Sequence, residues 1–234
     1  MNTFSLILEG KRSRDQHGNL RHRTEGQVSA IESLMKFAAE RKDAVREAVT
    51  VGRQDLRDGR TDSFALTMDR DRSRHPLTIP VQKVERSNDE WIDGDTTIVS
   101  IDAYYPTTSS RLETEIPAYY LIPADEEDLL ELLDLHHVEM TRLDEPEDFD
   151  VERYQLGEFR TEELANASYD IPEVEVDRTT VSAREGDVLV STSQLHRLIL
   201  ATALEPQSKH GLLQYDEFAR WRDLEYFPVM RVME

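Results

Sequence analysis

The sequence of 234 residues lacks cysteine and is sparing with lysine, glycine and aromatic residues. Without cysteine, disulfide bonds and thiolate metal sites are excluded, and redox chemistry gives no indication of the compartment. No hydrophobic run approaches the roughly 20 residues that a membrane-spanning helix needs. The first residues carry neither a basic segment nor a cleavable apolar one. We therefore expect no membrane partner, and the localisation stays open.

Positive charge is also scarce. The chain has 28 basic and 48 acidic residues, so its net charge is −20, and only five of the basic residues are lysine. Few lysines and evenly spread acidic residues are typical of halophilic adaptation, because salt screens the self-repulsion that opposes compaction. No basic stripe survives this much negative charge, so we expect no nucleic-acid partner. The composition suits a high-salt environment.

The first predicted element is a buried strand over residues 3–9. It is a short run rich in Phe, Leu and Ile that ends on Glu9, with Gly10 immediately after it. A strand that presents a carboxylate at its end is a common way to hold a general base. The alternative is that Glu9 is only the first solvent-facing residue after the strand. Because a core strand would begin at the third residue, we expect the chain to start within a larger fold.

Helices are predicted next. Thr24 and Gln27 have the spacing of a capping box, and apolar residues recur at helical spacing over residues 28–38. The helical pattern continues over residues 43–56 and stops near Gly59. A strand followed by a long amphipathic helix is a unit of α/β architecture. We therefore predict that residues 1–60 are the strand–helix part of a mixed-sheet α/β domain.

Residues 61–234 have the pattern of a β-rich α+β region. Residues 173–182 and 187–191 are predicted to form a hairpin around Gly186, and residues 226–232 an edge strand. The remaining predicted strands cover residues 63–68, 78–84, 96–105, 117–122, 138–143 and 149–156, and the predicted helices cover residues 125–135 and 195–204.

Only one pair of residues has the spacing of metal ligands. His136 and Glu139 form an H-x-x-E motif, and on a helix two residues three apart can reach one zinc ion. The motif lies where an acidic helix gives way to a strand, which would point the two side chains to opposite faces. We therefore favour a structural role for this pair. The other histidines are scattered singly and are expected at the surface or as caps: His17, His22, His75, His196 and His210.

Other catalytic patterns are weaker. The sequence has no Gly-x-Ser-x-Gly elbow and no glycine-rich phosphate loop. Arg12 lies in a basic cluster after Glu9, where a guanidinium group would match a substrate carboxylate; the alternative is a solvated basic patch. Two tyrosine pairs, at residues 104–105 and 119–120, are expected either in the β core or on a binding surface.

Three parts of the sequence resemble the carboxypeptidase A-like zinc metallopeptidases, in particular the prokaryotic, haloarchaeal-type branch with a β-rich extension. Residues 4–9, followed by residues 23–34, look like the last catalytic strand of that family, its glutamate and the helix behind it. Residues 116–123 (Ile-Pro-Ala-Tyr-Tyr-Leu-Ile-Pro) resemble a segment of the extension. The closing region of the extension is resembled by residues 187–194, which end in Gln, and by residues 204–212, which contain Leu-Glu-Pro-x-Ser and Gly-Leu.

The resemblance implies that Glu9 is the general base, which activates a zinc-bound water and later protonates the leaving amine of a peptide substrate. It covers only the C-terminal part of such an enzyme. The zinc ligands of the family precede the glutamate strand, whereas His136 and Glu139 follow it. Branch members continue the glutamate with Thr-Arg, whereas Gly10, Lys11 and Arg12 follow here, so Arg12 departs from the family pattern.

Two hypotheses follow from the sequence. In the first, the chain is the C-terminal portion of a zinc metallocarboxypeptidase-like protein and is incomplete alone. It then binds no zinc by itself, and a partner chain or a homo-oligomer is expected. In the second, the chain is a non-enzymatic protein- or glycan-binding module on a degraded peptidase scaffold, with Tyr104, Tyr105, Tyr119 and Tyr120 as the contact residues.

Overall fold

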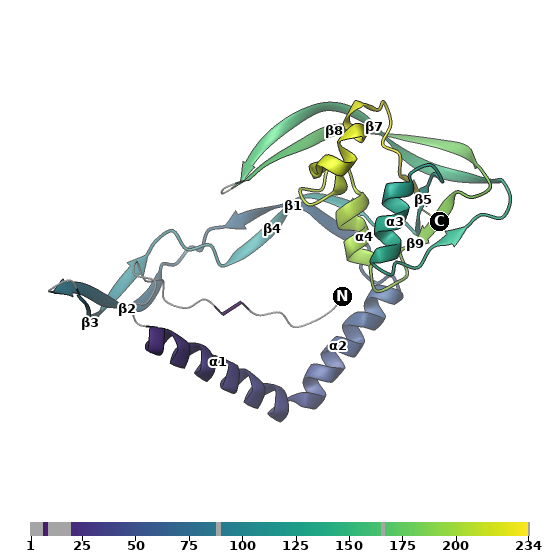
Figure 1. Ribbon diagram of the computed structural model, residues 1–234. Coiled ribbons are helices and arrows are strands. Elements are labelled where there is room, and N and C mark those ends of the chain that lie inside the picture. Colours follow the sequence, from purple (N-terminus) through teal and green to yellow (C-terminus); the bar gives the residue numbers. More distant parts are fainter. Residues whose placement is uncertain (1–6, 9–19, 88–89, 165–166, 234) are drawn as a thin grey trace. The chain divides into compact units, whose positions relative to one another are not determined.

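The computed structural model describes residues 7–8, 20–87, 90–164 and 167–233 (Figure 1). The fold mixes helices with sheets and is broadly α+β. The chain divides into two compact bodies. Of the described residues, the first body contains those within 51–68 and 110–233, and the second contains those within 7–50 and 69–109. Within the described residues, no helix is both long enough and apolar enough to cross a membrane.

Two helices occupy the segment that was predicted to be helical. Helix α1 spans Leu20–Glu40 and α2 spans Lys42–Arg57. The predicted capping box is wrong, because α1 begins four residues before Thr24, and the pair Arg21–Glu25, at 2.7 Å, links its first turns. The predicted end of the second helix is confirmed. Gly59 adopts φ +68°, a left-handed conformation that ends helices and that glycine adopts without strain.

Two strand pairs follow. Strand β2 (Leu77–Ser87) pairs with β3 (Glu90–Ile101), and β1 (Ser63–Asp71) pairs with β4 (Thr107–Glu115). Strand β4 is absent from the strands predicted above. Most of its side chains are exposed, and its sequence does not alternate between apolar and polar residues. It forms a strand because it pairs with β1.

The first body is built on a six-stranded sheet, and its described neighbouring strands pair antiparallel. The order of strands is β6-β9-β5-β10-β7-β8. Their bounds are Tyr119–Ile122 for β5, Thr141–Arg142 for β6, Glu147–Leu164 for β7, Ala167–Ala183 for β8, Val188–Ser191 for β9 and Met230–Val232 for β10.

The sheet corrects two strand predictions. The predicted hairpin of residues 173–182 with 187–191 is wrong, because β8 pairs with β7 while β9 pairs with β5 and β6. Gly186 does turn the chain, with φ +91°, but it directs β9 to other partners. The C-terminal strand is not at an edge, since β10 lies between β5 and β7. Both errors concern contacts between residues far apart in the sequence, which local patterns do not encode.

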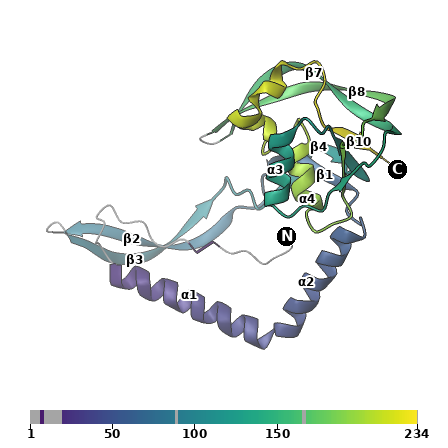
Figure 2. The ribbon, with the colours of Figure 1, turned by 45° about the vertical axis from the view of Figure 1, so that its right-hand side comes forward.

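Four helical segments pack on one face of this sheet. They are α3 (Glu127–Leu135), α4 (Arg197–Leu204) and the 3₁₀ helices η1 (Leu212–Gln214) and η2 (Asp216–Asp223). Helices α3 and α4 lie side by side in both views (Figures 1 and 2). They form the main core with Tyr120 and Ile122 of β5, whereas Leu121 points to a smaller cluster on the opposite face.

Candidate functional site

The predicted catalytic residues fall outside the part of the chain that the structure describes. Glu9 and Arg12 are both among the residues that are not described. Ile7 and Leu8, the two described residues of the predicted first strand, belong to no helix or strand, and their side chains are exposed. The roles of Glu9 and Arg12 therefore stay predictions.

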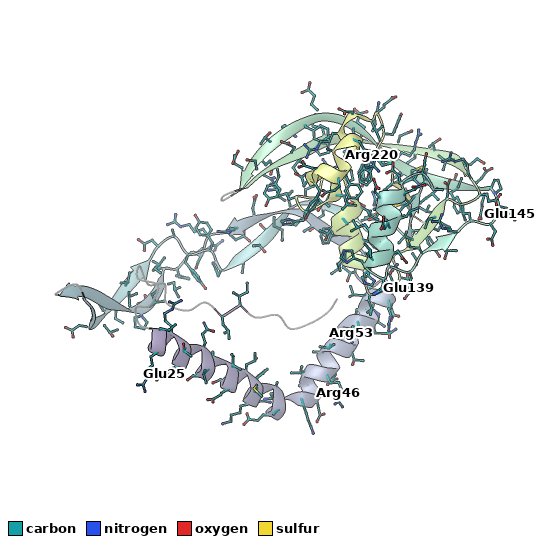
Figure 3. The ribbon with its side chains drawn as sticks, in the orientation of Figure 1. Glu25, Arg46, Arg53, Glu139, Glu145 and Arg220 are labelled. Carbon is teal, nitrogen blue, oxygen red and sulfur yellow. The ribbon has the colours of Figure 1, made fainter. Side chains whose placement is uncertain are left out.

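The His136–Glu139 pair lies at the end of α3. His137, with φ 55°, reverses the chain, and its N–H donates to the carbonyl of Asp134 at 2.8 Å. The N–H of Val138 donates to the carbonyl of Leu133 at 3.0 Å, which completes a Schellman-type helix end. Glu139 lies beyond this turn (Figure 3), so the two side chains do not share a helical face. Over the described residues, no group of three or more His, Asp or Glu is placed to hold a metal ion.

Among the described residues of the first body, the most strongly buried charged side chain is that of Glu205, which follows α4 directly and is 1% exposed. It accepts a hydrogen bond from the hydroxyl of Tyr120 at 2.8 Å and another from the hydroxyl of Tyr154 at 2.6 Å. The Nε atom of Arg231 lies 3.4 Å from Oε1 of Glu205. Because an unpaired buried carboxylate is costly, this convergence of two neutral donors and a cation is what permits its burial.

Arg231 is the buried cation of the cluster. It lies 3.1 Å from Glu152, donates to the hydroxyl of Tyr154 at 2.7 Å and donates to the backbone carbonyl of Glu115. Strand register explains these contacts, since Arg231 stands opposite Tyr120 on β5 and opposite Glu152 on β7. We refer to Tyr120, Glu152, Tyr154, Glu205 and Arg231 as the Glu205 cluster.

Burial and neighbouring charges perturb the pKa values of the cluster. Burial raises the pKa of Glu205, while Arg231 and the two tyrosine hydroxyls oppose this shift. Burial, followed by the charge of Glu205, raises the pKa of both Tyr120 and Tyr154, so the two phenols stay neutral donors. Burial lowers the pKa of Arg231, but Glu205 and the tyrosines raise it by more, and the guanidinium stays charged. The cluster thus joins β5, β7, β10 and the end of α4 through buried hydrogen bonds and ion pairs.

Backbone hydrogen bonds hold the loop after Glu205. The N–H of Ser208 donates to the carbonyl of Glu205 at 3.1 Å, and the N–H of Gly211 donates to the carbonyl of Ser208 at 3.0 Å. A Cβ atom at Gly211 would lie 2.9 Å from the carbonyl oxygen of Glu205. A side chain at this position would force the two backbone segments apart, which gives a physical reason for the glycine of the Gly-Leu pair.

Buried polar contacts also fix the segment after β9. The side-chain amide of Gln194 donates to the carbonyl of Ser191 at 2.6 Å, and its oxygen accepts from the N–H of Glu139 at 3.0 Å. Thr192 donates to the carbonyl of Pro117 at 2.6 Å and accepts from Arg197 at 2.7 Å. Glu139 is therefore a backbone partner of Gln194.

Sequence reasoning assigned no role to Glu205, Tyr154 or Arg231. The available signal was a charged residue inside an apolar run, as with Arg231 in Pro-Val-Met-Arg-Val. Such a residue indicates a buried pair, but the sequence does not say which distant acid completes it.

Comparison with known proteins yields no matching protein-family model, no matching curated protein and no matching solved structure. The roles assigned around Glu205 accordingly rest on its contacts alone.

Proposed function

We propose that the chain is the C-terminal portion of a zinc metallocarboxypeptidase-like protein that hydrolyses peptide bonds once it is completed. In this proposal Glu9 is the general base, Arg12 contacts the substrate, and residues 61–234 form the β-rich extension of the enzyme. Further polypeptide, in the same or a partner chain, supplies the zinc ligands. The chain thus provides one half of a site whose metal is held by the other half.

One observation carries this proposal: the segments that separately resemble the extension contact one another. Tyr120, from residues 116–123, donates to Glu205, from residues 204–212. Thr192, from residues 187–194, donates to the carbonyl of Pro117. The two parts that resemble the extension and its closing region are thus joined by hydrogen bonds within one body, as the proposal expects of a single extension. Their convergence supports a common origin of the segments in one inherited domain.

The exposed face of α1 supports a partner polypeptide. Val28, Ile31, Leu34 and Met35 lie on one side of this helix and are 46%, 48%, 39% and 68% exposed. An amphipathic helix ordinarily buries such a stripe. Covering it would contribute roughly 25 cal/mol for each Å² of apolar surface removed from water. The resemblance places this helix behind the catalytic strand, so the metal-binding half is the cover that we propose.

The test is to complete the enzyme. The DNA next to the start of the coding sequence is examined for an H-x-x-E motif and a later histidine, and that polypeptide is co-expressed with residues 1–234. We expect one zinc ion per complex and release of C-terminal residues from N-blocked peptides. Glu9→Gln should lower kcat by about 10²–10⁴-fold, the usual contribution of a general base, at unchanged zinc content. Glu139→Gln is the matched control and should leave kcat unchanged.

Three results would contradict the proposal. Stoichiometric zinc and hydrolysis by residues 1–234 alone would show that the chain is complete. A normal rate in the Glu9→Gln complex would remove Glu9 from the mechanism. A neighbouring sequence without zinc ligands would favour the second function.

The second candidate function is a non-enzymatic protein- or glycan-binding module. It is favoured by exposed tyrosines, because Tyr105 and Tyr119 are 48% and 40% exposed, and aromatic faces are frequent contact surfaces. Tyr120 does not belong to such a surface, since it is fully buried against Glu205. Alanine at position 105 or at position 119, each tested alone, should then weaken partner binding and leave the fold intact, as judged by circular dichroism.

A further inference from the structure

The first body contains a large apolar groove between α3, α4 and the η1–η2 segment. Its volume is about 850 Å³. Leu132, Leu133 and Val138 contribute to it from α3 and the turn after it, while Leu212 and Phe218 contribute from η1 and η2. All five belong to the main core or pack against it, so the floor of the groove is fixed by the fold.

The rim of the groove is acidic. It is lined by three acidic residues, Asp128, Glu131 and Glu217. The described residues that line the groove include no Lys or Arg. Asp128 is partly neutralised by Arg220 of η2 (Figure 3), which lies 3.3 Å from it and also binds Glu126. Within the described part of the chain, Glu131 and Glu217 have no ion-pair partner. The rim therefore offers two carboxylates to an incoming cation.

Apolar side chains beside the acids remain exposed. Leu135, Ile199 and Tyr215 line the groove and are 70%, 41% and 53% exposed. Contiguous exposed apolar surface next to polar groups is characteristic of interaction sites. The groove thus combines an apolar floor with a negatively charged edge, and an occupant that satisfies both must be amphipathic and cationic.

We propose that this groove binds a short, cationic amphipathic helix of a partner protein. The apolar face of that helix enters the groove, and its Lys or Arg side chains face Glu131 and Glu217. The nine residues of α3 span about 13 Å at 1.5 Å per residue. This length matches apolar positions i, i+3, i+4 and i+7 of a bound helix. The proposal goes beyond the proposed function and does not depend on it.

Charge selects this occupant over two others. A second copy of the chain carries the same net charge of −20, so its surface would be repelled by the acidic rim. Anionic lipid headgroups are disfavoured for the same reason. A cationic helix is instead attracted by the whole chain as well as by the rim, which raises its association rate.

The experiment uses the full chain and a fluorescein-labelled 14-residue Leu/Lys peptide with leucines at i, i+3, i+4 and i+7. Fluorescence anisotropy is measured at the lowest salt at which circular dichroism shows the chain folded. We expect saturable 1:1 binding. The Glu131→Gln/Glu217→Gln double variant should weaken it by about three- to tenfold, as two exposed ion pairs would. Ile199→Lys should weaken it further, because it places a cation on the apolar wall.

Two controls separate the groove from general attraction. Glu185→Gln removes an exposed charge from the turn before β9 and should leave the affinity unchanged. A peptide of the same composition with its leucines scattered around the helix should bind at least tenfold more weakly. Equal binding of the scattered peptide, equal weakening by Glu185→Gln, or an unaffected Ile199→Lys variant with native circular dichroism would each overturn the proposal.

Discussion

Replacing Arg231 by methionine tests the Glu205 cluster most sharply. Arg231 is 5% exposed and lies near two carboxylates, 3.4 Å from Glu205 and 3.1 Å from Glu152. Methionine keeps much of the side-chain volume but removes the charge. Glu205 would then lose its buried cation, whereas Glu152 would keep its contact with Arg178 at 2.8 Å.

Removing one partner of a buried pair typically costs about 3–5 kcal/mol, since the remaining charge stays buried without compensation. At roughly 2–4 °C per kcal/mol for a protein of this size, the expected fall in Tm is about 6–20 °C. The matched control is Arg178→Met. Arg178 also pairs with Glu152, but its side chain is 82% exposed, so its removal should cost no more than about 1 kcal/mol.

The loss should also depend on pH. Burial already raises the pKa of Glu205, and Arg231 opposes this shift, so the pKa rises further in the variant. A raised pKa in the folded state means that the fold favours the protonated carboxyl. The stability that this provides is present below the unfolded value of about 4.3 and is lost as the pH rises through the folded value. The deficit of Arg231→Met should therefore grow between pH 5 and pH 8.

The assay is urea unfolding followed by tryptophan fluorescence, in which the fully buried Trp221 reports on the first body. Equal losses for Arg231→Met and Arg178→Met would refute the reasoning. So would a deficit below about 1 kcal/mol, or one that does not change between pH 5 and pH 8.

Four further predictions concern the rest of the chain. Gly211→Ala should destabilise by about 1–3 kcal/mol, because the new Cβ would lie 2.9 Å from the carbonyl oxygen of Glu205; an unchanged urea midpoint would contradict this. His137→Gly should raise Tm and stabilise by up to about 1 kcal/mol, since His137 has φ 55°, and a lower Tm would argue against strain there. A hydrogen bond from Lys209, then one from Arg111, lowers the pKa of Glu162. The stability that ionised Glu162 contributes is thus present above the ordinary glutamate pKa of about 4.3, and it is lost as the pH falls through the lower pKa of the folded state. The Glu162→Gln variant should therefore lose less stability than the unaltered protein on acidification below about pH 4.3. Finally, the free energy of unfolding should rise with KCl because the net charge is −20, and a fall between dilute and molar KCl would contradict halophilic adaptation.

Local patterns predicted the helices well. The spacing of apolar residues placed α2, α3 and α4 within a few residues of their observed bounds. The start of α1 was placed too late, because Thr24 and Gln27 offered a cap that the helix does not use. Arg21 and Glu25, one helical turn apart, form an ion pair that is compatible with helix before Thr24. A search for capping residues alone does not take this pair into account.

The sheet and the candidate site were harder to predict because they depend on distant partners. Strand β10 lies between β5 and β7, and this position brings Arg231 opposite Glu152, 79 residues earlier in the chain. Neither residue alone indicates the other. Glu205 was visible as part of a motif, but its burial follows from donors on β5 and β7 that only the folded sheet brings to it.

The comparison of Glu9→Gln with the unaltered protein, both completed by the zinc-binding half, tests the central claim most directly. The measurement is kcat for release of a C-terminal residue, with zinc content determined on the same samples. We expect about a 10²–10⁴-fold lower kcat at equal zinc content. Equal kcat values in the two completed proteins would contradict it.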